Sequence, residues 1–142
     1  MKSARRRSRE LALQAIYAWQ LSGTSFQDLM LQLAGTKGFD KADEVYLRAL
    51  VTGVIDEADA LRASIEPHVD RSWDSLSPVE RGILLMAAYE LKFVPEVPYR
   101  VAINEAVEIA KVFGGTDGHK YVNGVLDRAA RSLRPAEATS RP

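Results

Sequence analysis

Apolar side chains recur at intervals of three and four residues along most of this 142-residue chain, and no segment shows sustained alternation of apolar and polar residues. This spacing places apolar groups on one face of an α-helix, whereas a half-buried β-strand requires alternation. The pattern therefore predicts an all-α protein. The expected helices span approximately residues 4–22, 25–34, 44–66, 78–92, 99–113 and 118–133.

One of these helices has a clear start and an apolar surface on all sides. Ser77 and Glu80 stand at the N-cap and N3 positions of a capping box, and Pro78 occupies the favoured first helical position. The segment Ile83–Tyr89 that follows contains only apolar and aromatic residues. Because a helix that is apolar all round must be buried, we expect residues 78–92 to be the central element of the core.

Proline and glycine divide the remaining helices and suggest how the chain is organised. Pro67 should end the long helix of residues 44–66, since proline cannot continue a helix. We expect a single helical domain over residues 1–134, with an N-terminal half of about 1–67 and a C-terminal half of about 70–134. Residues 135–142 are expected to form a disordered tail.

The net charge is zero, but the first nine residues concentrate positive charge and contain no acidic residue. The basic residues of this arm are Lys2, Arg5, Arg6, Arg7 and Arg9. A concentrated positive region suggests a polyanionic partner, most often a nucleic acid. The alternative is a solvated chain end that binds nothing.

No residue pattern points to catalysis, a cofactor or a metal. The absence of cysteine excludes disulfides and thiolate chemistry, and the two histidines lie far apart in the sequence. The loop Gly114–Lys120 does not fit the spacing of a phosphate-binding loop, so we expect a turn in which Thr116 or Asp117 caps the last helix. We therefore predict a non-enzymatic protein. With no apolar run long enough for a membrane span, and no apolar segment after the basic start, the expected location is the cytoplasm.

Two tyrosines add to the basic arm as candidate nucleic-acid contacts. A helical projection places Tyr17 on the face of the first helix opposite its apolar stripe, together with Arg6, and places Tyr121 at the margin of the last helix's stripe. An exposed ring beside an arginine suits stacking on an unpaired base while the guanidinium contacts phosphate. This favours single-stranded RNA over duplex DNA. The alternative for Tyr17 is packing against a neighbouring helix.

Four blocks of sequence are recognisable, and they occur in one order over nearly the entire chain. They are Arg5–Tyr17, Leu76–Arg81 with Ala88–Leu91, Val97–Val107, and His119–Asp127. Together these blocks resemble the NusB family of bacterial transcription antitermination factors. The resemblance implies an all-α fold of about seven helices in two packed three-helix subdomains.

The resemblance also implies a function and partners. Family members bind the boxA element of nascent ribosomal RNA together with the tenth protein of the small ribosomal subunit, NusE, and join other Nus factors on RNA polymerase to suppress premature termination. The expected function is thus an RNA-binding adaptor for ribosomal RNA synthesis. The alternative is a protein-interaction module or homodimer whose basic arm binds another acidic partner.

Site residues follow by carrying the family's RNA contacts onto this chain. Those residues are Arg5, Arg6, Arg7, Arg9, Tyr17, Asp117 and Tyr121, to which the charge pattern adds Lys2. Asp117 repels phosphate, so its expected role is helix capping or accepting a hydrogen bond from a base. Glu80, with the edge of helix 78–92, is the expected contact for the ribosomal protein. No catalytic, cofactor-binding or metal-binding residue is expected.

Overall fold

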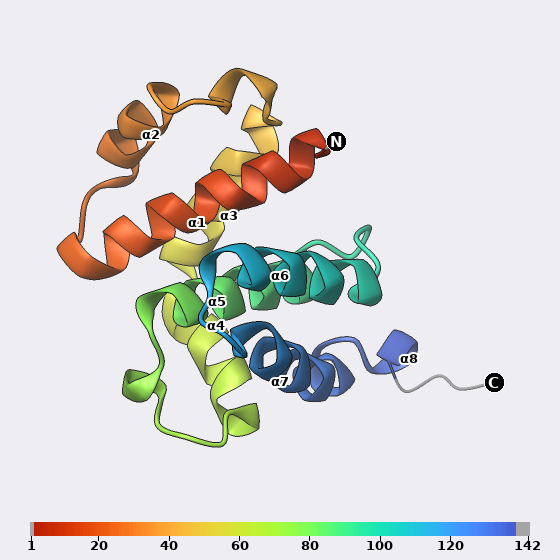
Figure 1. Ribbon diagram of the computed structural model, residues 1–142. Helices are drawn as coiled ribbons and strands as arrows, with labels where there is room; N and C mark the ends of the chain where they lie inside the picture. The colour runs from red at the N-terminus through yellow and green to blue at the C-terminus, as the bar shows by residue number, and fades with distance from the viewer. Residues whose placement is uncertain (1, 139–142) are drawn as a thin grey trace. The chain divides into compact units, whose positions relative to one another are not determined.

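The computed structural model describes residues 2–138, and within that range the regular structure is entirely helical (Figure 1). The α-helices are α1 (Ala4–Ser22), α2 (Phe26–Ala34), α3 (Glu44–Asp56), α4 (Ala58–Ile65), α5 (Pro78–Phe93), α6 (Tyr99–Phe113), α7 (Gly118–Leu133) and α8 (Pro135–Ala138). Three short 3-10 helices connect them: η1 (Phe39–Lys41), η2 (Glu66–His68) and η3 (Trp73–Ser75). The predicted all-α class is confirmed. None of the described helices combines the length and apolar character needed to cross a bilayer.

The chain forms two compact units, the first of which ends at Glu57. In this unit α1 packs against α2 and α3. The Ser3 hydroxyl accepts a hydrogen bond from the Arg6 N–H and so begins α1. Gly23 ends the same helix with a φ of 67°, a conformation that glycine adopts without strain. The core of the unit consists of apolar residues from all three helices: Leu11, Ala12, Ala15, Ile16, Leu29, Leu33, Leu47, Leu50 and Val51.

The second unit begins at Ala58 and is organised around α5. As expected, Ser77 and Glu80 form a capping box: the Ser77 Oγ accepts from the Glu80 N–H at 3.1 Å, and the Glu80 Oε1 accepts from the Ser77 N–H at 3.1 Å. Helix α5 packs against α4, α6 and α7. Its apolar residues Ile83, Leu84 and Ala88 are completely buried, which confirms the central position predicted for this helix.

The boundary between the units interrupts a segment that the sequence presents as a single helix. The expected helix of residues 44–66 is two helices, because Glu57 leaves helical geometry with φ −110° and ψ 17°. Helix α3 packs against α1, whereas α4 packs against α5 and α7. The apolar stripe stays in phase across the single intervening residue, so its periodicity gives no sign of the break. The division consequently falls at Glu57 rather than near residues 67–70.

The segment after Arg134 differs from the disordered tail expected for residues 135–142. Residues Pro135–Ala138 form the short helix α8, and the Ala138 side chain is buried. Glu137 anchors this helix: one carboxylate oxygen accepts from the Tyr99 N–H at 3.2 Å, and the other pairs with the Arg134 guanidinium. These two contacts hold the pKa of Glu137 below its ordinary value, the Tyr99 N–H having the larger effect. Residues 139–142 lie outside the described part of the chain.

Arg134 itself is buried and donates hydrogen bonds to backbone carbonyls at the end of α5. Its guanidinium donates to the Leu91 carbonyl at 2.6 Å and to further backbone carbonyls in and after the last turn of that helix. These further acceptors are the oxygens of Glu90, Val94 and Val97. The last carbonyls of a helix have no partner within the helix, so a side chain from elsewhere must satisfy them when they are buried. Arg134 does this from the end of α7.

Candidate nucleic-acid interface

The basic segment at the start of the chain is folded rather than an extended arm. From Ala4 onward it is the beginning of α1. Ser8 is completely buried, and its hydroxyl donates to the Asp43 carbonyl at 2.7 Å and accepts from the Asp43 N–H at 2.9 Å. These two bonds attach α1 to the N-cap of α3. The positive charges are therefore presented by a rigid helix.

Arg9 does not belong to the exposed basic residues. Its side chain is only 5% exposed, and its guanidinium carbon lies 5.4 Å from the centre of the Tyr46 ring. Tyr46 of α3 covers the face of α1 from which Arg9 extends, and contact between Arg9 and RNA stays a prediction. Arg5, one turn earlier, lies 4.1 Å over the same ring. Arg5 is exposed, so stacking on Tyr46 orients its guanidinium without hiding it.

Four cations thus remain at the surface of this end of α1. Lys2 is exposed and pairs with Glu10 at 2.8 Å, and Arg6 and Arg7 are partly exposed. Asp43 lies 4.0 Å from Arg5. Both partners of the Arg5–Asp43 pair are exposed, and because exposed ion pairs are worth little in water, phosphate can replace the Asp43 carboxylate at small cost. The four cations make this end of the first unit suited to a polyanion.

Tyr17 lies about three turns further along α1 and is 41% exposed, as its position in the helical projection predicts. Leu21, one turn beyond, is also exposed, so the two side chains share a face of the helix. An aromatic ring at the surface is available for stacking on a base. Sequence reasoning placed this residue correctly.

The remaining predicted contacts lie in the second unit, at the start of α7. Asp117 holds the N-cap position, but its side chain makes no capping hydrogen bond and is exposed. Its carboxylate instead lies 3.6 Å from the Lys120 ammonium. The expected capping by Asp117 is therefore wrong, and its carboxylate is open to solvent. No group of three histidine, aspartate or glutamate side chains within residues 2–138 is arranged to hold a metal ion.

Tyr121 is half-buried and has a cation on its ring. The guanidinium of Arg71 lies 4.2 Å from the ring centre, and Arg71 in turn pairs with Asp70 at 3.2 Å. The Tyr121 hydroxyl is buried with no hydrogen-bond partner among the described residues. Burial raises the pKa of this tyrosine. One face of the ring is thus occupied by Arg71, a cation that was not among the site residues predicted from the sequence.

Glu80 lies near the same helix start. Its Oε1 is used in the capping box of α5, and a Cβ added to Gly118 would lie 3.8 Å from its Oε2. The structure therefore brings Glu80 next to the first turn of α7, close in the chain to Asp117 and Tyr121. Its contact with a protein partner stays a prediction.

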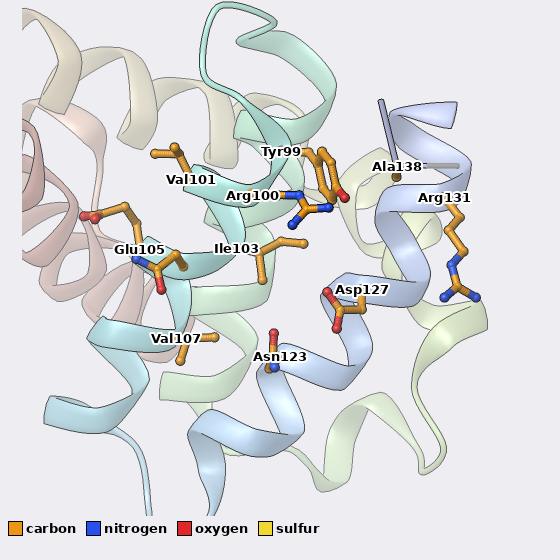
Figure 2. A pocket seen from close by; sticks show the side chains of 11 residues that line it. Tyr99, Arg100, Val101, Ile103, Glu105, Val107, Asn123, Asp127, Arg131 and Ala138 are labelled. Atoms are coloured by element: carbon orange, nitrogen blue, oxygen red, sulfur yellow. The ribbon is translucent and has the colours of Figure 1, made fainter. Parts of the chain in front are cut away.

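A groove of about 760 Å³ between α6 and α7 was not anticipated from the sequence (Figure 2). Ile103 and Val107 of α6 point into it, as do Asn123 and Asp127 of α7. Its polar residues flank the apolar stripes of two amphipathic helices, a position that in the sequence looks like any solvated helix face. Only the packing of α6 on α7 reveals that they face a common space.

Comparison with known proteins identifies relatives over almost the whole chain. The family model described as "NusB family" matches residues 6–131. The Transcription antitermination protein NusB of Paraburkholderia phymatum is 58% identical over 137 residues, which is 96% of this chain and 94% of the relative. The protein of the same name from Burkholderia mallei is 56% identical over 140 residues, covering 99% of this chain and 97% of the relative.

Solved structures agree with these sequence matches. The structure of T. maritima NusB has a TM-score of 0.84 at 29% identity and covers 98% of this chain and 99% of its own. A chain from a crystal structure of antitermination factors NusB and NusE in complex with double-stranded RNA has the same fold, with a TM-score of 0.75 at 23% identity, covering 89% of this chain and 96% of its own. On the strength of the family model and of relatives that match nearly end to end, this chain belongs to the NusB family.

Proposed function

We propose that this chain is a non-enzymatic RNA-binding adaptor of transcription antitermination, acting in the cytoplasm on boxA-type RNA together with NusE. Its relatives carry the name of transcription antitermination proteins, and a protein with its fold has been crystallised with NusE and RNA. The observation that carries the RNA-binding part is the set of surface cations at the start of α1. A helix that holds its cations in place loses little entropy when it binds a polyanion.

The contacts divide by their chemistry. Lys2, Arg5, Arg6 and Arg7 supply affinity for phosphates that does not depend on sequence. Tyr17 supplies a stacking surface for a base. In the second unit, Tyr121 and the open carboxylate of Asp117 supply further base contacts, the latter by accepting from an exocyclic amino group. RNA that contacts both units would thus be held by charge in one and read by polar and aromatic groups in each.

The contribution of the cations is measured by the salt dependence of binding. Replacing Arg5, Arg6 and Arg7 together with glutamine should make the log–log salt slope for single-stranded RNA shallower by about 2, since each neutralised phosphate contributes about −0.7. Glutamine retains helix propensity, so α1 should remain folded. Fluorescence anisotropy with labelled boxA RNA from 50 to 200 mM salt gives the slope.

A matched control removes three exposed cations elsewhere: Arg48, Lys92 and Lys111, each replaced with glutamine. This variant has the same net charge as the first, so it separates local contact from general attraction. Equal salt slopes for the two variants would contradict the assignment of phosphate contacts to the start of α1.

Tyr17 should act differently from the cations. We expect Tyr17→Ala to weaken RNA binding by about 1–3 kcal/mol, the range found for removing an aromatic ring that stacks on a base. Because stacking releases no counterions, the loss should persist at high salt. The measurement is the same titration at two salt concentrations, and Leu21→Ala on the same face is the control. An effect of Tyr17→Ala that vanishes in high salt would argue against stacking.

The proposed function as a whole is tested by titrating boxA RNA and a scrambled RNA of equal length, with and without NusE. An antitermination adaptor should prefer boxA and bind it more tightly when NusE is present. The competing function is a protein-interaction module or homodimer that uses its basic end on another acidic partner. That alternative predicts no preference for boxA and no effect of NusE on RNA affinity.

A further inference from the structure

The segment of residues 35–43, here called the α2–α3 loop, returns the chain to the start of α1 (Figure 1). Its 3-10 helix η1 packs against α1. A Cβ added to Gly38, the residue before η1, would lie 3.9 Å from the Arg7 Nη1. Gly38 has a φ of 92°, a conformation that favours glycine. The loop therefore passes the Arg7 guanidinium at a position where its backbone can approach closely.

The backbone of the α2–α3 loop is ordered by its own hydrogen bonds. The N–H groups of Thr36, Phe39 and Lys41 each donate to the carbonyl three residues earlier, at 2.9 to 3.2 Å. At the end of the loop, Asp43 is attached to α1 by its two hydrogen bonds with the Ser8 hydroxyl. The side chains of the loop thus extend from a backbone of defined shape, and binding through them costs little backbone entropy.

The unpaired cations of the first unit are gathered at this place. Lys37 and Lys41 are exposed, and their ammonium groups make no hydrogen bond or ion pair with the described residues. The Arg7 guanidinium likewise has no carboxylate partner between residues 2 and 138. The other cations of the unit all have interaction partners: Lys2, Arg5, Arg6, Arg9 and Arg48. Phosphate can therefore bind the three unpaired cations without displacing a carboxylate.

The spacing along the loop lets these charges act together. Lys37 is the chain neighbour of Gly38, with consecutive Cα atoms about 3.8 Å apart, and Lys41 follows Gly38 by one 3-10 turn, about 6 Å. Both separations are shorter than the Debye length of about 10 Å at 0.1 M salt. Asp40 is exposed between the two lysines and is the carboxylate that opposes them. A chain of phosphates that continues past Arg7 accordingly meets further positive charge.

We propose that the α2–α3 loop is a second part of the RNA-binding surface, in which Lys37 and Lys41 bind phosphates of the nucleotides that continue past Arg7. The inference rests on the RNA-binding function proposed above and lengthens the single-stranded RNA that the first unit contacts. Because an ammonium group contacts phosphate as a point charge, the loop adds affinity and no base preference. Residues 35–43 fall outside the four recognisable sequence blocks, so the resemblance did not indicate these lysines.

Salt-dependent titration of single-stranded boxA RNA tests the proposal. Replacing Lys37 and Lys41 together with glutamine should make the log–log salt slope shallower by about 1.4, since each phosphate contributes about 0.7. The affinity advantage of wild type over this variant should accordingly shrink about sevenfold between 50 and 200 mM salt. The matched control replaces the exposed Lys92 and Lys111 with glutamine, which gives the same net charge and should leave the slope of wild type.

Removing the opposing carboxylate should have an effect of the opposite sign. Asp40→Asn is expected to strengthen RNA binding by up to about fivefold, the size of one exposed charge interaction, and the gain should decrease as salt is added. Disruption of the loop would weaken binding, so a gain in affinity identifies an electrostatic effect. Unchanged or weaker binding by Asp40→Asn would overturn the proposal.

The absence of cysteine permits a direct measurement of contact. A photo-crosslinker attached to Lys41→Cys should couple to boxA RNA on irradiation, whereas one attached to Leu31→Cys, at an exposed position of α2, should not. If wild type fails to bind RNA at all, the proposed function itself fails. If wild type binds RNA but the double lysine variant has the same salt slope, only the loop assignment is overturned. Unchanged RNA binding with weaker NusE binding would also overturn it, by making the loop a protein-binding surface.

Discussion

Replacing Arg134 with methionine is expected to lower the free energy of unfolding by about 3–5 kcal/mol, the range found when one partner of a buried charged network is removed. Methionine occupies a similar volume but donates no hydrogen bond. The carbonyl oxygens of Glu90 and Val94 also accept from backbone N–H groups, but those of Leu91 and Val97 would lose the guanidinium donor in a region where water does not replace it. Glu137 would lose its pairing cation, and α8 would be held less firmly.

Chemical denaturation followed by circular dichroism provides the measurement. Arg131→Met is the matched control, because Arg131 lies one turn earlier on α7 and is exposed; its expected cost is within about 0.5 kcal/mol. Arg134→Lys should be intermediate, since an ammonium cannot reach all the acceptors of a planar guanidinium. Similar stabilities for the two methionine variants would show that the carbonyls find other donors.

Truncation of Leu84 to alanine is expected to have a comparable effect, costing about 2–5 kcal/mol through lost burial and the cavity left behind. Leu84 is completely buried on α5, the helix against which α4, α6 and α7 pack. Since three helices contact α5, a neighbouring side chain cannot fill the space without disturbing a second contact. Thermal or urea denaturation measures the difference.

Leu31→Ala provides the comparison, because Leu31 is a helical leucine that is 73% exposed. That variant should lie close to wild type, as alanine is the better helix former and no cavity results. If Leu84→Ala were equally harmless, α5 would not be the central element of its unit.

Local signals in the sequence predicted the helices well. The Ser77 capping box and the apolar circumference of residues 83–89 both depend on neighbours within the same helix, and the structure confirms both. The break at Glu57 depends instead on tertiary packing, because α3 packs its apolar face against α1 whereas α4 packs its apolar face against α5 and α7. A stripe that remains in phase carries no information about the identity of those partners.

The candidate site shows the same limit. The exposure of Tyr17 follows from its angle on α1 and was predictable, but Arg5 and Arg9 lie one turn apart on one face and have different environments. Tyr46 of α3 causes that difference, and no spacing within α1 reveals it. The groove of α6 and α7 likewise exists only once the two helices are packed.

The attachment of Arg134 to α5 also sets an order of events during synthesis. The Leu91 carbonyl is made 43 residues before the guanidinium that satisfies it. At translation rates of about 5–20 residues per second, the last turn of α5 waits roughly 2–9 s for its donor. In that interval the first unit, which ends at Glu57, is already complete and free to fold. The second unit is therefore completed late. If a ribosome stalls shortly before codon 134, the carbonyls at the end of α5 lack the guanidinium that satisfies them. Such an incompletely folded chain is a natural substrate for chaperones and proteases.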